Sequence, residues 1–103
     1  MVTYEITATV DAALAARYER YMRERHVPDV LATGCFAGAA FTRAAAGRYR
    51  VRYEARDRAA LDRYLRDHAA ALRAHFAETF PVGVTLSREE WEHLERWALS
   101  SDS

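Results

Sequence analysis

Apolar residues in this 103-residue chain recur with two different periods, and the order of the periods constrains the fold more than any motif. Segments in which apolar and polar residues alternate are typical of half-buried strands; they are residues 3–10, 35–43 (the weakest), 48–56 and 82–86. Segments in which apolar residues recur every three or four positions are typical of helices; they are residues 12–25 and 58–78. This order predicts an α+β, ferredoxin-like βαββαβ fold: a four-stranded antiparallel sheet with two helices on one face.

Length and composition indicate one globular domain over residues 1–103. Half of the residues are apolar and 29% are charged, which is typical of a chain that buries a core. All fifteen basic residues are arginine, as expected of a GC-rich genome. They balance fifteen acidic residues. A net charge of zero argues against nucleic-acid binding, which uses a basic surface.

Several classes of protein are excluded by what the sequence lacks. No apolar run is long enough to span a membrane, and the first residues do not have the pattern of a signal peptide, so we expect a cytoplasmic protein. Cys35 is the only cysteine, and the four histidines include no pair at the spacing of a helical metal site. Glycine-rich phosphate loops are absent. We therefore expect no metal and no cofactor.

Local signals predict where the helices begin and end. Asp11 and Asp57 are typical N-caps for the two helices. Pro28 disfavours helical dihedrals in the residue before it, so the first helix should stop or kink near His26. One further turn then follows, and Gly34 closes it.

Two interpretations of residues 88–98 stay open. Ser87 and Glu90 match a capping box, and the spacing of Trp91, Leu94 and Trp97 suits a helix. A bulged continuation of the fourth strand would also place these apolar side chains on a packing surface.

The second face of the predicted sheet is polar. If Ile6 and Val51 face the helices, that face carries Thr3, Glu5, Thr7, Arg50, Arg52 and Glu54. The face is either solvated or packed against the same face of a second copy, which would enclose a polar cavity. In the second case the arginines need carboxylate partners or a bound anion.

The segment HVPDVLATGCF at 26–36 resembles an H-[IV]-P-D-x-x-x-T-G-x-F motif of a small bacterial family of unknown function. The resemblance extends over most of the chain, through Tyr4, the strand Tyr49-x-Val51-x-Tyr53 and the helix with Tyr64, His68, Leu72 and Arg73. That family is similar to the dimeric α/β-barrel superfamily, which includes heme-degrading and quinone-forming monooxygenases. The resemblance implies a homodimer that packs sheet to sheet, with a last strand reaching about Leu94. It implies no particular activity.

Five residues are candidates for a site. His26 is a candidate general acid or base that Asp29 orients, although the two also suit a purely structural corner, with Asp29 as an N-cap. Arg50, Arg52 and Tyr53 are candidate ligand contacts.

Other titratable residues suit the core. His68 lies on the apolar stripe of the second helix, which favours a partly buried structural histidine. Cys35 suits a buried, inert thiol, and Tyr49 and Tyr64 suit the core or an interface.

Two functions fit these features. The chain either binds or transforms a small polar or aromatic molecule in a cavity at the sheet face, or it is a non-catalytic regulatory or protein-interaction module.

Overall fold

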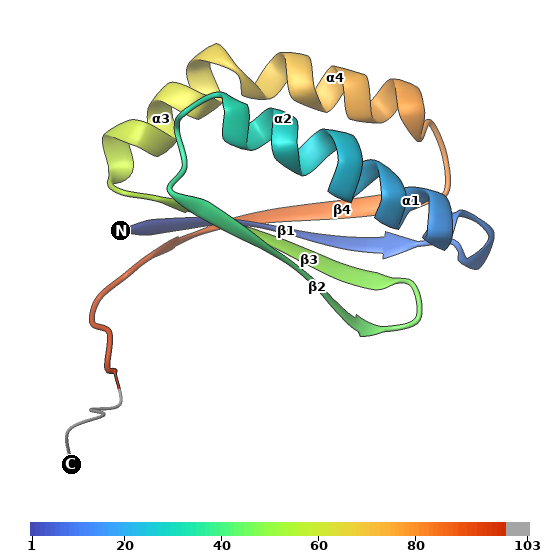
Figure 1. Cartoon of the computed structure of the whole chain (residues 1–103), viewed down its shortest axis with the longest axis horizontal. Helices are drawn as coiled ribbons and strands as arrows, with labels where there is room; N and C mark the ends of the chain where they lie inside the picture. The colour runs from blue at the N-terminus through green and yellow to red at the C-terminus, as the bar shows by residue number, and fades with distance from the viewer. Residues whose placement is uncertain (99–103) are drawn as a thin grey trace.

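The computed structural model describes residues 1–98 and contains a four-stranded antiparallel sheet with the helices on one face (Figure 1). The strands lie in the order β2-β3-β1-β4, with bounds β1 Val2–Val10, β2 Gly38–Ala45, β3 Arg48–Ala55 and β4 Val84–Glu92. The helical segments are η1 Ala12–Leu14, α1 Ala15–Tyr21, η2 Met22–His26, α2 Val27–Ala32, α3 Arg58–Asp67 and α4 Ala69–Thr79. Element order and pairing confirm the predicted ferredoxin-like fold.

The first helical arm runs from η1 to α2 without stopping, because the chain widens into a π turn at η2 just before Pro28. Proline lacks an N–H group, and the wider turn near His26 accommodates it where a stop or kink is predicted. The arm ends as predicted at Gly34, whose φ of 75° is left-handed. Asp11 stands at the predicted N-cap position, but its side chain makes no capping hydrogen bond. The arm opens with a 3₁₀ turn, in which the Leu14 N–H donates to the Asp11 carbonyl oxygen at 2.8 Å.

The second helical arm consists of two helices, α3 and α4, and the single long helix predicted there is wrong. The chain leaves helical conformation at His68, whose φ and ψ are −128° and −34°. Tyr64 and Ala69 are both buried, yet a continuous helix would point them in different directions; the break returns both to the core. The predicted cap of α3 is confirmed, because a carboxylate oxygen of Asp57 accepts a hydrogen bond from the Ala60 N–H at 2.9 Å.

Strand β4 continues to Glu92 and pairs with β1 along its whole length. The strand interpretation of the residues after Ser87 is therefore correct as far as Glu92, and the capping-box helix is wrong. A ladder of backbone hydrogen bonds to a distant strand outweighs the local capping signal. Residues 93–98 have no regular structure, so the strand ends two residues before Leu94.

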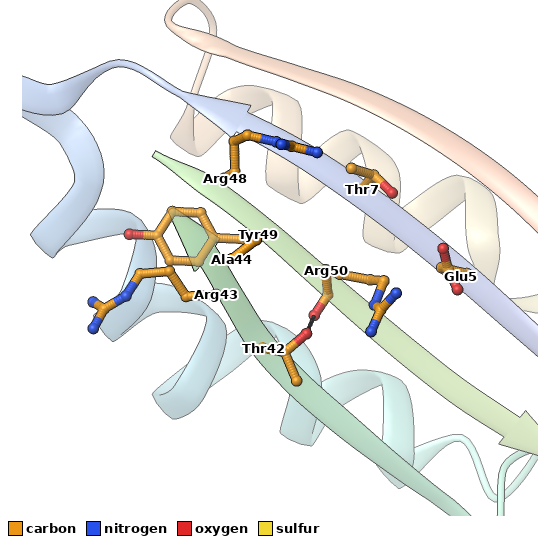
Figure 2. A pocket seen from close by; sticks show the side chains of 8 residues that line it. All are labelled: Glu5, Thr7, Thr42, Arg43, Ala44, Arg48, Tyr49 and Arg50. Carbon is orange, nitrogen blue, oxygen red and sulfur yellow. Dashed lines mark hydrogen bonds between the residues drawn. The ribbon is translucent and has the colours of Figure 1, made fainter. Parts of the chain in front are cut away.

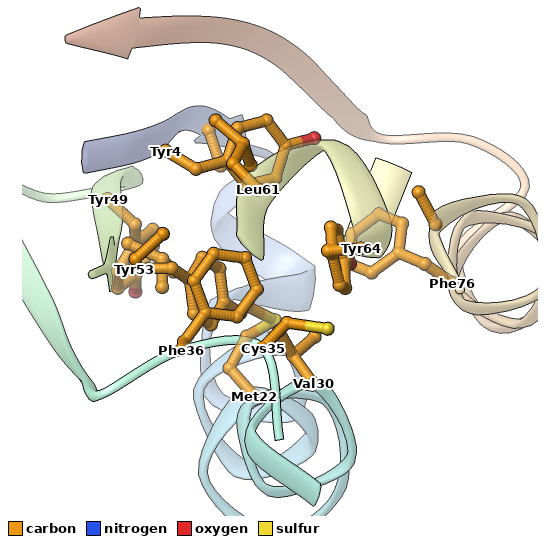
Figure 3. Close-up of a cluster of buried hydrophobic side chains, with 14 of the residues drawn as sticks. Tyr4, Met22, Val30, Cys35, Phe36, Tyr49, Tyr53, Leu61, Tyr64 and Phe76 are labelled. Atoms are coloured by element: carbon orange, nitrogen blue, oxygen red, sulfur yellow. The ribbon is translucent and has the colours of Figure 1, made fainter. Parts of the chain in front are cut away.

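The core lies between the sheet and the helices and consists largely of aromatic rings (Figure 3). The ring centroids of Tyr18 and Tyr49 are 4.9 Å apart, and Phe36 and Tyr64 are equally close. The predicted core positions Cys35, Tyr49 and Tyr64 are all buried. Within residues 1–98, no helix has both the length and the apolar character needed to cross a lipid bilayer.

Candidate functional site at the open face of the sheet

One face of the sheet points away from the helices (Figure 1). Polar residues of β1 and β3 alternate onto that face. The register of β1 against β3 pairs Thr3 with Glu54, Glu5 with Arg52, and Thr7 with Arg50, which confirms that the polar residues predicted for this face share it. We call this surface the open face; on β1, β2 and β3 it carries Thr3, Glu5, Thr7, Thr42, Arg48, Arg50, Arg52 and Glu54. The register of β4 adds Ser87, Glu89 and Trp91, which lie opposite Thr7, Glu5 and Thr3.

A groove of about 280 Å³ lies at the hairpin end of the open face (Figure 2). Its lining residues are Glu5, Thr7, Thr42, Arg43, Ala44, Arg48, Tyr49 and Arg50. A β-bulge between Arg43 and Ala45 bends β2 here, because the extra residue increases the local twist. The Thr42 hydroxyl donates a hydrogen bond to the Arg50 carbonyl oxygen at 3.3 Å, which holds the two strands together at the groove.

The groove has an excess of positive charge. Glu5 and Arg52 form an ion pair beside it, with Nε of Arg52 3.3 Å from a Glu5 carboxylate oxygen. That Nε is buried, and the contact does not have hydrogen-bond geometry. Among residues 1–98, neither Arg48 nor Arg50 has a carboxylate within 4.0 Å. Two unpaired guanidinium groups therefore lie next to one compensated pair, an arrangement that suits an anionic ligand.

The structure places His26 and Asp29 on the other side of the sheet. His26 is half-buried in the seam between η2 and α4, with its ring centroid 5.9 Å from Tyr21 and 5.5 Å from Phe76. Burial lowers the pKa of His26 to about 4, against a smaller opposite effect of Asp29. The Asp29 carboxylate instead binds Arg25 at 2.9 Å, and no hydrogen bond joins Asp29 to His26 in the described part of the chain.

Tyr53 is likewise separated from the two arginines named with it. Successive side chains of a strand point to opposite faces, so Tyr53 points into the core while Arg52 lies on the open face. Burial raises the pKa of the Tyr53 hydroxyl. Arg48, and not Tyr53, lines the groove together with Arg50. The alternation of residues 48–56 already assigns Arg48 to the same face as Arg50, so the sequence contained that signal.

The remaining candidates do not assemble a second centre. Cys35 is buried, and its sulfur accepts a hydrogen bond from Nε of Arg63 at 3.4 Å. The Tyr21 hydroxyl lies 2.6 Å from Nδ1 of His75 in the helix seam. No three His, Cys, Asp or Glu side chains from residues 1–98 come close enough together to hold a metal ion.

Solved structures share this fold. HapK from Hahella chejuensis superposes with a TM-score of 0.72 at 18% identity, over 98% of this chain and 100% of that one. A candidate antibiotic biosynthesis monooxygenase from Deinococcus radiodurans gives 0.72 at 16% identity, over 98% and 100%. The heme-degrader MhuD from Mycobacterium tuberculosis, with two hemes bound in its active site, gives 0.69 at 19% identity, over 95% and 100%. Identities this low show similarity of fold alone.

Sequence comparison identifies a family without an activity. No protein of curated function matches the chain. Residues 1–94 match the family described as "Domain of unknown function (DUF4286)". That match covers most of the chain and agrees with the family of unknown function expected from the sequence, although it does not test the motif at residues 26–36. The chain therefore belongs to the DUF4286 family, with a ferredoxin-like fold.

Proposed function

We propose that this chain pairs with a second copy of itself through the open face and binds a small polar or aromatic molecule with an acidic group between the two sheets. The observation that supports this most is that Arg48 and Arg50 have no carboxylate partner among residues 1–98, although they lie beside the Glu5–Arg52 ion pair. Packing the open face against another surface takes these cations out of water. A buried cation is costly unless an anion pairs with it, and a planar carboxylate can accept two hydrogen bonds from one guanidinium.

Similarity of fold supports a small-molecule ligand of this kind in general terms. MhuD, with the same fold, holds two hemes in its active site. Heme therefore belongs among the ligands tested, alongside small carboxylates.

The second candidate function is a non-catalytic regulatory or protein-interaction module. The position of His26 favours it, because this histidine lies in the helix seam and lines no part of the groove at Arg50. In this candidate the open face joins two copies and binds no small molecule.

Thermal unfolding with added ligands tests the proposal. We would use benzoate, citrate, heme and flavin on the wild-type protein and on a double variant, Arg48→Ser with Arg50→Ser. Arg20→Ser is the matched control, because Arg20 is exposed on α1 and has no carboxylate within 4.0 Å among residues 1–98. A ligand at 100 times its dissociation constant stabilises the folded state by about 2.7 kcal/mol.

We expect an acidic ligand to stabilise the wild type and the Arg20→Ser variant, and to have little effect on the double variant. If no ligand stabilises the wild type, or if the double variant responds equally, the ligand site is not at the open face. Sedimentation velocity of the same samples tests the pairing of two copies, and a monomer at all concentrations would overturn that part.

A further inference from the structure

The most exposed aromatic side chains of the protein lie in one segment at the end of β4. Trp91 is 47% exposed, Leu94 91% and Trp97 81%. The N–H of His93 still donates to the Met1 carbonyl oxygen at 3.0 Å, and its Nε2 lies 2.7 Å from the Thr3 hydroxyl. Beyond His93 the chain runs away from the body of the molecule (Figure 1). We call residues 91–98 the C-terminal arm.

Three large apolar side chains in eight residues are an unusual group to expose to water. Single exposed apolar residues are normal on protein surfaces, whereas a group of them marks an interaction site. Tryptophan in particular is enriched at interfaces, because its ring buries a large area and loses little conformational entropy. The arm therefore has the composition of a segment that is covered in its working state.

The charge of the arm indicates what covers it. Within the arm, the two glutamates Glu92 and Glu95 outnumber the one arginine, Arg96, so the arm is acidic. The hairpin of β2 and β3 has the opposite character on the open face, with Arg48, Arg50 and Arg52 against Glu54. The two regions are complementary in charge, whereas two copies of the acidic arm would repel each other.

The arm does not reach that hairpin within its own chain. In the sheet order β2-β3-β1-β4 the arm follows one edge strand and the hairpin includes the other. Strand β2 is therefore an edge whose outer backbone groups are free to pair with another segment. A second copy of the chain is the partner that brings an acidic, tryptophan-bearing arm to this edge.

We propose that the C-terminal arm of each copy lies along β2 of its partner, at the rim of the partner's open face, in a two-fold exchange. The inference rests on the pairing of two copies under the proposed function, and it adds which segment joins them. Such an exchange is self-complementary, because each copy contributes the same arm and the same edge. The partner's tryptophans then form a wall of the groove that one chain leaves open, beside Arg48 and Arg50, where an aromatic ligand would stack.

The area involved suits a stable interface. Aromatic side chains bury about 150–250 Å² each when enclosed. Trp91 is already half covered, so two exchanged arms contribute on the order of 500 Å² from their tryptophans. That is roughly a third of the ~1,600 Å² of a standard interface, and the two open faces supply the rest.

Disulfide cross-linking between differently tagged copies tests the exchange. In a Cys35→Ser background, one tagged copy has Thr42→Cys on β2 and one untagged copy has Ala98→Cys at the end of the arm, which leaves both tryptophans in place. Val82→Cys in the untagged copy is the control, because Val82 is 76% exposed and lies outside both the arm and the open face. We expect mild oxidation to link Thr42→Cys to Ala98→Cys at least tenfold more than to Val82→Cys.

The native tryptophans give a second readout, because the chain has two tryptophans and both lie in the arm. Dilution through the dissociation of the pair should shift their emission to longer wavelength. Leu94→Ala with Trp97→Ala should raise the dissociation constant at least tenfold and leave the circular dichroism unchanged, since neither side chain belongs to the core.

The outcomes separate the two proposals. Cross-linking above the control in a sample that sediments as a dimer supports both. A dimer in which Thr42→Cys links to the arm no more than to Val82→Cys overturns the exchange and leaves pairing through the open face in place. A monomer without cross-links overturns both.

Discussion

The Tyr53 hydroxyl is buried without a hydrogen-bond partner among residues 1–98, and we expect its removal to stabilise the protein. The residue is 1% exposed and packs against Tyr4 and Phe36. On the scale of protein mutations, an unpaired buried hydroxyl costs about 1–3 kcal/mol. The void left by the lost oxygen offsets part of this gain. Tyr53→Phe should therefore raise the free energy of unfolding by about 1 kcal/mol.

A neighbouring tyrosine provides the matched control. The Tyr4 hydroxyl accepts a hydrogen bond from Nη2 of Arg73 at 2.8 Å, and the ring is 3% exposed in the same aromatic cluster as Tyr53. Tyr4→Phe removes a hydroxyl that has a partner, so it should lower the free energy of unfolding by about 1 kcal/mol. The same chemical change on paired strands thus has opposite signs.

Urea unfolding followed by circular dichroism, at one fixed protein concentration, measures both variants. In thermal unfolding, each kcal/mol corresponds to a shift of about 4–8 °C for a domain of this size. If Tyr53→Phe destabilises the protein as much as Tyr4→Phe, the Tyr53 hydroxyl is hydrogen-bonded in solution, for example to a buried water, and the reasoning is refuted. If Tyr53→Phe binds a ligand more weakly than the wild type does, the ligand site lies on the helix side of the sheet.

Two further predictions concern the helices. Burial lowers the pKa of His26 from 6.5 to about 4. Between these pH values the ring is therefore protonated in the unfolded chain and neutral in the folded protein. The free energy of unfolding then falls, as pH falls through this window, by up to about 1.4 kcal/mol per pH unit. His26→Phe should lose that part of the slope in urea unfolding at pH 7, 6 and 5, and an unchanged slope would contradict the burial of His26. Asp57→Ala should destabilise the protein by about 1 kcal/mol in the same assay, because it removes the cap of α3. Asp62→Ala, at an exposed position of α3, is the control and should cost less than about 0.5 kcal/mol. Equal losses would show that the cap does not stabilise α3.

The parts of the fold that sequence predicts well are those whose signal is local and periodic. Residues 3–10 and 48–56 alternate because each strand buries one face, and the structure places both within a residue or two of those bounds. The prediction is less accurate for β2, which begins at Gly38. Cys35 and Phe36 are apolar because they enter the core from a loop, and an apolar loop residue has no periodicity that separates it from a strand.

The errors share a physical cause: the deciding interaction is made with a residue that the local pattern does not single out. The capping box at Ser87 predicts a helix from four residues, but β1 offers β4 a full ladder of hydrogen bonds. His26 and Asp29 are predicted to act together at the corner near Pro28. The helix continues through that corner, so Asp29 pairs with Arg25 four residues before it, and His26 packs against the distant Phe76.

The sheet divides the titratable groups of the chain into two sets, and the division limits the chemistry of the open face. The histidine that sequence singles out is on the helix side, where burial keeps its ring neutral near pH 7. On the open face the groove has one carboxylate, Glu5, and Arg52 already compensates its charge. Arg48 and Arg50 are the charged groups of the groove that have no carboxylate within 4.0 Å among residues 1–98, so they are the ones that can take an anionic ligand. This is why we propose binding of an anion, and not proton transfer, at the open face.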